Sequence, residues 1–260
     1  NGSVIMRYGN TAALVTAVMS KGEKELDYMP LTVDYEERFY AAGEILGSRF
    51  IRREGRPTDE AVLSGRIVDR TIRPLFDKRM RREVQVVVTI LSIDEDDPDI
   101  LGVIGASLAL GASDIPWGGP VSTVRIGKLK PMNGEGRPFI INPQYNDRQK
   151  NPEFEMDLVA CGKDGLINMI EVGGKEVGEQ TIVAAVGEAS KEIEKLQEWQ
   201  KKIIAEIGKA RQAIVLPETP EHVKILFAEK IAPKMEGYIF AKKQAGNAGI
   251  YELKSEWMAI

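Results

Sequence analysis

A strand, a turn and a helix that follow one another in the middle of the chain constrain the fold most strongly. Residues 84–93 (VQVVVTILSI) are rich in β-branched side chains and predict a strand. Residues 100–112 (ILGVIGASLALGA) are apolar on all sides and include small residues, which predicts a buried helix that packs closely on its neighbours. This unit predicts a mixed α/β core rather than an all-helical or all-strand protein.

The acidic turn between these two elements, residues 94–99, has two interpretations. Calcium binding is one of them, but the turn lacks the alternating spacing and the distal Glu of an EF-hand loop. The favoured interpretation is a solvated turn that supplies negative charge to the N-terminus of the next helix.

Other segments extend the same pattern. The sequence predicts a buried strand at 11–19, a hairpin at 155–160 and 166–172, a long helix at 177–207 and a shorter helix at 222–232. Pro217 and Pro220 separate the two helices. The predicted fold class is therefore α+β, a mixed sheet packed with helices and followed by an all-α segment.

The chain has only one histidine and one cysteine, and this scarcity excludes several classes of protein. The single histidine, His222, leaves no Ser-His-Asp triad or multi-histidine metal site. The single cysteine, Cys161, leaves no disulfide framework and indicates a reducing, cytoplasmic compartment. No apolar run approaches the ~20 residues that cross a bilayer, so we expect no membrane protein. No signal-peptide pattern opens the chain, which begins as though the natural chain started further upstream.

Positive charge is concentrated in one segment of this acidic chain. Between Arg49 and Arg82 there are eleven basic residues, ten of them arginine, and five acids. The segment nets +6, so the rest of the chain, whose total is −4, nets −10. The arginine side chain binds phosphate in two-point fashion, so this segment predicts a localised polyanion site. Solvated helix faces with local ion pairs, such as Asp69 with Arg73, are the equally weighted alternative.

Part of this segment is predicted to be a helix that begins at Thr58. Thr58 is a suitable N-cap, and the two acids that follow it suit the helix dipole. Val62, Leu63 and Ile67 are expected to form the apolar stripe, and Pro74 is expected to end the helix. The spacing of its arginines places three of them on one face: Arg66, Arg70 and Arg73.

Nucleotide-binding glycine loops are not indicated, because residues 43–48 (GEILGS) lack the lysine of a P-loop. Asp157, a carboxylate between apolar strand neighbours, is interpreted as structural more readily than as catalytic.

Several blocks of the sequence resemble the polynucleotide phosphorylase family. They include residues 48–58 (SRFIRREGRPT), 65–76 (GRIVDRTIRPLF), 105–110 (GASLAL) and 114–116 (DIP). The resemblance covers at least residues 9–172 in uninterrupted order. It implies residues 1–211 as a first RNase PH-like core without its opening strands, and 212–260 as part of an all-α linker domain.

The family degrades RNA from its 3′ end with inorganic phosphate and releases nucleoside diphosphates, which is a phosphorolytic nucleotidyltransferase reaction. The resemblance implies single-stranded RNA as substrate, a homotrimeric ring, Mg²⁺ held in a second core, a cytoplasmic location, and association with an RNA-decay complex. It also implies that this core guides RNA and builds the ring, while catalysis lies in the second core.

The family's catalytic groups are mostly replaced in this chain. Its phosphate-binding serine pair falls at Pro98 and Asp99, and its D-x5-D-x-K run falls at Asn151, Asp157 and Val159. Only Asp157 keeps a catalytic residue type, so no catalytic or metal-binding residue is assigned here, and we expect this chain alone to be inactive.

The resemblance assigns RNA or phosphate binding to the arginine loop and to a second group of arginines on the helix that begins at Thr58. The assigned residues are Arg49, Phe50, Arg52, Arg53, Arg56, Arg70 and Arg73. Phe50 would stack on a base or anchor the loop, and Arg70 or Arg73 would bind phosphate or pair with an acid. Two rivals remain open, a stand-alone phosphorolytic exoribonuclease and a non-catalytic RNA-binding ring subunit of exosome type.

Overall fold

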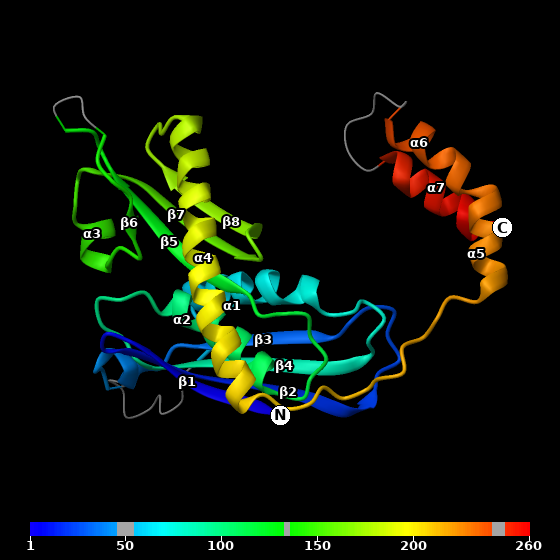
Figure 1. The fold of residues 1–260 in the computed structure, drawn as a ribbon, viewed down its shortest axis with the longest axis horizontal. Coiled ribbons are helices and arrows are strands. Elements are labelled where there is room, and N and C mark those ends of the chain that lie inside the picture. The colour runs from blue at the N-terminus through cyan, green and yellow to red at the C-terminus, as the bar shows by residue number, and fades with distance from the viewer. Residues whose placement is uncertain (46–54, 133–135, 241–247) are drawn as a thin grey trace. The chain divides into compact units, whose positions relative to one another are not determined.

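The chain forms two compact units, Asn1–Ile214 and Val215–Ile260 (Figure 1). The structure is a computed structural model that describes residues 1–45, 55–132, 136–240 and 248–260. Within these ranges, no helix combines the length and the apolar character needed to cross a membrane.

The first sheet of unit 1 has four strands in the order β1-β2-β4-β3. These are β1 (Gly2–Tyr8), β2 (Thr11–Glu23), β4 (Arg82–Ser92) and β3 (Leu31–Glu36). The strand predicted at 84–93 is confirmed as β4, which pairs antiparallel with β2 and parallel with β3. Its alternate residues are fully buried, because they face the helices that cover one side of the sheet.

Helix α2 (Pro98–Ala112) packs on β1 and β2 and is buried along its length, as predicted. The acidic turn supplies its N-cap, because the Asp97 side chain accepts a hydrogen bond from the Asp99 backbone N–H. Gly105 allows the close approach, since a Cβ there would lie 2.6 Å from a methyl carbon of Val15.

Helix α1 (Asp59–Ile72) begins at the predicted cap, Thr58, and ends before the short 3-10 turn η2 (Arg73–Leu75). The prediction for its apolar stripe is wrong at two of three positions. Ile67 is buried, but Val62 is 49% exposed and Leu63 is 57% exposed. The buried face is built from smaller residues instead, and Gly65 brings the helix to within 3.4 Å, measured from an ideal Cβ, of the Tyr35 Cβ.

The second sheet of unit 1 is antiparallel, with the order β6-β5-β7-β8. Its strands are β5 (Ser122–Leu129), β6 (Ile140–Ile141), β7 (Phe154–Lys163) and β8 (Leu166–Gly174). The predicted hairpin is confirmed as β7 and β8, which turn at Asp164 and Gly165 with positive φ angles. A short helix, α3 (Tyr145–Gln149), lies between β6 and β7.

Helix α4 (Glu179–Ile207) is the long helix predicted after residue 174, and it packs on both parts of unit 1 (Figure 1). Its N-terminal half contributes Ala185, Ala189 and Ile193 to the core of the second sheet. Its C-terminal half packs Ile203 and Ile204 on the side of α2 that carries Ile100, Ile104 and Leu108. The helix therefore joins the two layers that the sheets form.

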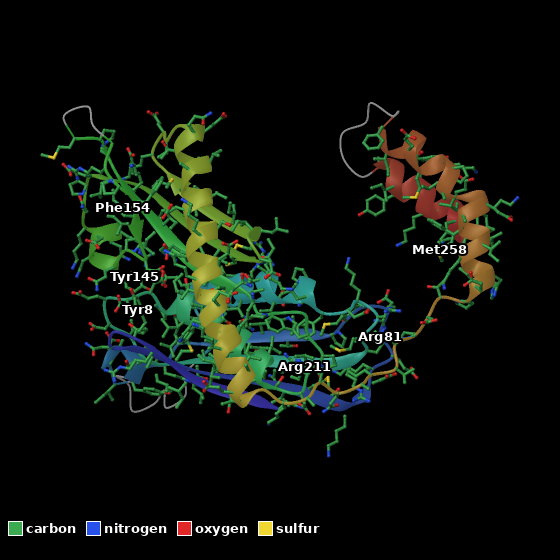
Figure 2. All side chains as sticks on the ribbon, viewed as in Figure 1. Tyr8, Arg81, Tyr145, Phe154, Arg211 and Met258 are labelled. Carbon is green, nitrogen blue, oxygen red and sulfur yellow. The ribbon has the colours of Figure 1, made fainter. Side chains whose placement is uncertain are left out.

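The segment after α4 returns along unit 1 and caps α2. The Arg211 guanidinium donates hydrogen bonds to the carbonyl oxygens of Leu110, Gly111, Ser113 and Ile115 (Figure 2). Lys209 Nζ donates to the carbonyl oxygen of Asn1. The Arg211 bonds to Leu110 and Gly111 satisfy carbonyl groups of the kind that a helix C-terminus leaves without partners.

Unit 2 contains α5 (Glu221–Lys230), α6 (Ala232–Phe240) and α7 (Ala248–Met258). The Phe227 and Trp257 rings pack edge to face, with centroids 5.3 Å apart. His222 is exposed near the start of α5.

Candidate functional site

The seven residues predicted to bind RNA divide into two groups. Four of them, Arg49, Phe50, Arg52 and Arg53, lie outside the described residues. Arg56, Arg70 and Arg73 are described, and all three are exposed.

Arg56 lies two residues before Thr58, whose hydroxyl group forms two hydrogen bonds. The Thr58 hydroxyl donates to Glu37 Oε2 at 2.9 Å and accepts from the Ala61 backbone N–H at 3.0 Å. Arg56 also lines an open pocket with Phe39, Glu44 and Tyr145. The C-terminal end of the predicted arginine loop is therefore attached both to α1 and to the segment that follows β3.

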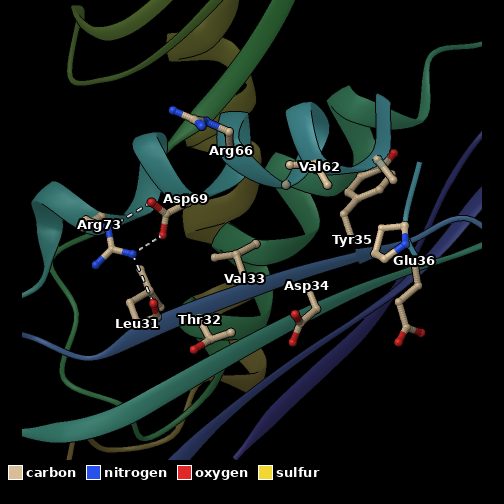
Figure 3. A pocket seen from close by; sticks show the side chains of 13 residues that line it. Leu31, Thr32, Val33, Asp34, Tyr35, Glu36, Val62, Arg66, Asp69 and Arg73 are labelled. Carbon is tan, nitrogen blue, oxygen red and sulfur yellow. Dashed lines mark hydrogen bonds and ion pairs between the residues drawn. The ribbon is translucent and has the colours of Figure 1, made fainter. Parts of the chain in front are cut away.

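Arg66 lies on the outer face of α1 with Val62 (Figure 3), and Arg70 and Leu63 are exposed as well. Arg66 and Arg70 form no hydrogen bond or ion pair with any residue that the structure describes. Arg73 is engaged: its Nε and Nη2 bind the two carboxylate oxygens of Asp69 at 2.9 and 2.5 Å. Arg66 and Arg70 thus keep free cationic groups on this face, which Arg73 does not.

Arg73 also protects the edge of the first sheet. Its Nη2 donates to the carbonyl oxygen of Leu31 at 3.1 Å, and β3 is an edge strand (Figure 3). Arg73 also lines a groove of about 440 Å³ that runs between β3 and α1. The ion pair predicted between Asp69 and Arg73 is therefore present, and the hydrogen bond from Arg73 to Leu31 joins the end of α1 to β3.

A second group of functional interest lies where the family's catalytic residues were mapped. Asp99, Asp157 and Val159 line one pocket, of about 360 Å³, at the N-terminus of α2. Asn151 does not line it. The structure thus brings three of the mapped positions together, although they come from two elements more than 50 residues apart.

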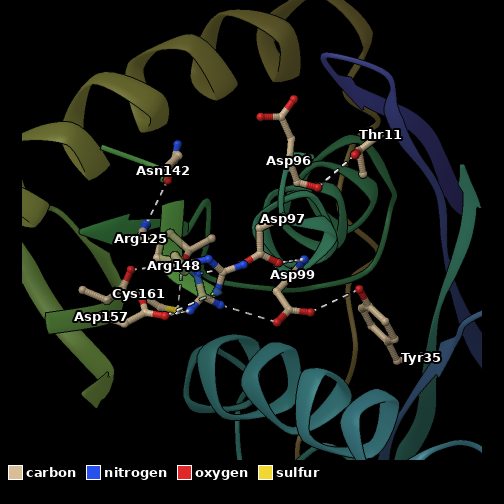
Figure 4. A network of polar contacts seen from close by, with 12 residues as sticks. Thr11, Tyr35, Asp96, Asp97, Asp99, Arg125, Asn142, Arg148, Asp157 and Cys161 are labelled. Atoms are coloured by element: carbon tan, nitrogen blue, oxygen red, sulfur yellow. Dashed lines mark hydrogen bonds and ion pairs between the residues drawn. The ribbon is translucent and has the colours of Figure 1, made fainter. Parts of the chain in front are cut away.

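In this pocket the carboxylates bind guanidinium groups of the same chain (Figure 4). Arg125 Nε lies 2.6 Å from Asp97 Oδ2, and Arg125 Nη1 lies 2.9 Å from Asp157 Oδ2. Arg148 contacts the same two oxygens at 3.1 and 3.4 Å. Asp99 is more distant, with 3.7 Å between its Oδ2 and Arg125 Nη2, and its Oδ1 accepts from the Tyr35 hydroxyl at 3.2 Å.

Burial and neighbouring charge change the acidity of this charge cluster, which comprises Asp97, Asp99, Arg125, Arg148 and Asp157. Burial, together with the charge of Asp97, raises the pKa of Asp99 to about 6. Burial opposes the charge of Arg125, but Asp97 and Asp157 outweigh this effect and raise its pKa. The cluster therefore contains one carboxyl group that titrates near neutral pH.

The cluster does not fit the phosphate or the metal ion that the family uses. The Asp157 Oδ2 atom is already shared by two guanidiniums, and Val159 offers no amine. A carboxylate, Asp99, stands where the family has a phosphate-binding serine. Among the described residues, no group of three or more His, Cys, Asp or Glu could hold a metal ion. The interpretation of Asp157 as structural agrees with these contacts.

Sequence reasoning missed Arg125 and Arg148 as partners of Asp157. One signal was available for Arg125, which stands between the buried Val124 and Ile126 as Asp157 stands between Met156 and Leu158. A lone charge in each of two neighbouring apolar strands indicates a pair across the sheet. The register confirms their closeness, since Arg125 pairs with Val159, two residues from Asp157.

Comparisons with known proteins agree with this geometry. Residues 1–116 match the family described as 3′ exoribonuclease family, domain 1. The chain is 42% identical over 260 residues to the polyribonucleotide nucleotidyltransferase of Exiguobacterium sibiricum, covering 99% of this chain and 34% of that protein. The protein of the same name from Thermus thermophilus is 46% identical over 226 residues, with 86% and 30% covered. That from Bacillus subtilis is 40% identical over 264 residues, with 100% and 36% covered.

A solved structure supports the fold. Rice (Oryza sativa) Rrp46 superposes with a TM-score of 0.60 at 11% identity, covering 78% of this chain and 88% of that chain. At this identity the likeness concerns the fold alone, and it confirms the predicted α+β, RNase PH-like class. This chain spans about a third of the length of its curated relatives. Its residues 1–116 match the 3′ exoribonuclease family, domain 1, and the chain as a whole is similar to the N-terminal part of polyribonucleotide nucleotidyltransferases.

Proposed function

We propose that this chain is the N-terminal region of a phosphate-dependent 3′-to-5′ exoribonuclease, which converts RNA(n+1) and phosphate into RNA(n) and a nucleoside diphosphate. In this proposal, the chain guides single-stranded RNA and contributes to a homotrimeric ring in the cytoplasm. A second core, outside this chain, binds Mg²⁺ and inorganic phosphate and performs the reaction. Residues 1–211 are the first core and 212–260 are part of the all-α linker domain.

The charge cluster is the observation that best supports the proposal that this chain guides RNA while a second core performs the reaction. Phosphorolysis needs cations on the phosphates and a carboxylate set that holds a metal ion. Here the Arg125 and Arg148 guanidiniums are bound to Asp97 and Asp157, so neither the cations nor the carboxylates are available to a substrate. The pocket supports a structural role in this core.

The outer face of α1 and the arginine loop support the RNA-guiding role. Arg56, Arg66 and Arg70 are exposed and have no partner among the described residues, so their guanidiniums are available to phosphates. Arg49, Arg52, Arg53 and Phe50 would extend this surface through the loop. Contacts of this kind bind the RNA backbone without reading its sequence. Arg73, already bound to Asp69, is assigned to positioning α1 rather than to phosphate binding.

The rival proposals are weaker on specific grounds. A stand-alone exoribonuclease would need a free metal-binding carboxylate set in the pocket of Asp157. A ring subunit of exosome type shares the fold, but the relatives at 40–46% identity are polyribonucleotide nucleotidyltransferases. The proposal includes association with an RNA-decay complex as a partner of the whole enzyme.

An activity assay tests the proposed lack of catalysis. The purified chain, with poly(A), phosphate and Mg²⁺, is expected to release no nucleoside diphosphate above a blank without protein. Phosphate-dependent release by the pure chain, at a rate that scales with its concentration, would refute the proposal and favour the stand-alone enzyme.

A salt titration tests the RNA-guiding role. If three or four phosphates are neutralised, the slope of log K against log salt is roughly −2 to −3 for a single strand. The double variant Arg52→Ala/Arg53→Ala is expected to flatten that slope by roughly 1.4. The matched control is Lys191→Ala/Lys195→Ala, which removes two exposed charges from α4. An equal effect of both double variants, or no effect of the arginine pair, would contradict the proposed site.

A further inference from the structure

Five charged side chains meet between α2 and the second sheet, and their charges do not cancel. The carboxylates of Asp97, Asp99 and Asp157 face the guanidiniums of Arg125 and Arg148 (Figure 4). Side-chain exposure is 4% for Asp97, 10% for Arg125 and 11% for Arg148, and it rises to 19% for Asp99 and 29% for Asp157. When every group is ionised, the cluster holds one excess negative charge in a place where water compensates little of it.

The distances identify Asp99 as the carboxylate without a close cation. Asp97 and Asp157 each have a guanidinium nitrogen within 2.9 Å. The nearest guanidinium nitrogen to Asp99 is 3.7 Å away, and its hydrogen bonds come from neutral groups, the Tyr35 hydroxyl and the Ser64 side chain. Of the three carboxyl groups, Asp99 therefore loses least when it takes up a proton.

The groups that surround Asp99 on other elements do not supply the missing cation. Arg125 and Arg148 are the only basic side chains that line this pocket in the described parts of the chain. Three acids line it as well, Glu37 after β3, Glu60 on α1 and Glu171 on β8. Neutral groups complete the surroundings, since burial raises the pKa of Tyr35 on β3, Tyr145 on α3 and the Cys161 thiol on β7.

We propose that Asp99 is a proton switch in this cluster, and that uptake of one proton by its carboxyl group strengthens the attachment of the second sheet to α2. With the proton bound, two carboxylates balance two guanidiniums. Without it, the excess charge weakens the cluster. The elements joined in this way are α2, which carries Asp99, and β5, α3 and β7, which carry Arg125, Arg148 and Asp157.

The direction of the pH dependence follows from the raised pKa of Asp99. Its pKa is about 6 in the folded chain, against about 3.9 in an unfolded one. The folded state binds this proton more tightly, so the contribution of Asp99 to stability is complete below about pH 4. It is lost as the pH rises through about 6. This direction is opposite to that of Asp77, whose pKa is lowered to about 2 by hydrogen bonds from Arg79.

The variant Asp99→Asn, which keeps the shape but cannot ionise, tests the switch in urea unfolding of the whole chain. The Asp99 pKa differs by about two units between the folded and the unfolded chain. Asp99→Asn is therefore expected to lower the equilibrium constant of unfolding on the order of 100-fold at pH 7.5. At pH 4 the variant is expected to gain only about twofold, because the wild-type carboxyl group is then protonated in the folded chain and about half protonated in the unfolded one. The proposal concerns stability and does not depend on the proposed RNA function.

Two further variants make the test specific. Asp97→Asn removes the carboxylate that both arginines contact, and it is expected to raise the unfolding constant at pH 7.5, opposite to Asp99→Asn. Asp77→Asn, at an exposed aspartate, is the control and is not expected to stabilise the chain at pH 7.5.

A direct measurement covers the case in which a variant does not fold. The side-chain carboxyl ¹³C signal of Asp99 in the wild-type chain is expected to titrate with a midpoint between pH 5 and 7. A midpoint below about 4.5 would overturn the proposal. So would destabilisation by Asp99→Asn at pH 7.5, or an equal gain from it at pH 4 and pH 7.5.

Discussion

Replacing Arg73 by alanine is expected to destabilise unit 1 and to leave RNA binding nearly unchanged. The change removes an ion pair with Asp69 between helix positions four apart, which is worth about 0.5 kcal/mol when exposed. It also removes the hydrogen bond to the Leu31 carbonyl on the edge strand, worth about 1 kcal/mol. The sum is about 1–2 kcal/mol, which corresponds to a fall in Tm of about 3–6 °C for a domain of this size.

Arg70 provides the matched variant, because it lies one turn earlier on the same face and has no partner among the described residues. Arg70→Ala is expected to change stability by less than about 0.5 kcal/mol, as is usual for exposed positions. It is expected to flatten the RNA salt slope by roughly 0.7, the contribution of one phosphate contact.

The assay is a thermal melt of each variant together with titrations of fluorescent single-stranded RNA at several salt concentrations. The reasoning fails if Arg73→Ala keeps the wild-type Tm and flattens the slope, because Arg73 would then bind phosphate and not the sheet edge. It fails equally if Arg70→Ala lowers Tm and leaves the slope unchanged.

The remaining predictions concern packing and capping. Gly105→Ala is expected to cost about 1–3 kcal/mol in urea unfolding, since the new Cβ would lie 2.6 Å from a Val15 methyl carbon. Gly187→Ala on α4, where no atom lies within 4 Å, is the control and is expected to stabilise by up to about 1 kcal/mol. Arg211→Ala leaves four carbonyl groups near the end of α2 without this donor and is expected to cost about 1–3 kcal/mol, seen as faster amide exchange in the last turn of α2. Unchanged exchange there would contradict the assigned cap.

The elements with a strong local pattern could be predicted from the sequence. The β-branched run of β4 and the small apolar residues of α2 leave few alternatives, and Thr58 marks the start of α1 by its capping chemistry. The buried face of α1 could not be predicted from the size of its apolar side chains. Because α1 approaches β3 through Gly65, its larger residues Val62 and Leu63 are left outside.

The charge cluster was only partly predictable for a similar reason. Asp157 stood out as a lone carboxylate in a strand, but its partners depend on strand register and on the position of α3. Arg125 comes from the neighbouring strand and Arg148 from a separate helix, so neither pairing appears in any local window of the sequence. The raised pKa of Asp99 depends on its burial in the folded chain, where its neighbours include Tyr35, 64 residues earlier in the sequence.

The contact between Asn1 and Lys209 has a consequence for synthesis on the ribosome. The two residues are 208 positions apart, and α4, which packs on α2, ends only at Ile207. At about 5–20 residues per second, the first strands wait roughly 10–40 s for these partners. During that time the apolar side of α2 that α4 covers is exposed, with Ile100, Ile104 and Leu108 on it. Nascent chains stalled before residue 179 are therefore expected to bind chaperones that recognise apolar surface, and chains stalled well beyond residue 209 are not.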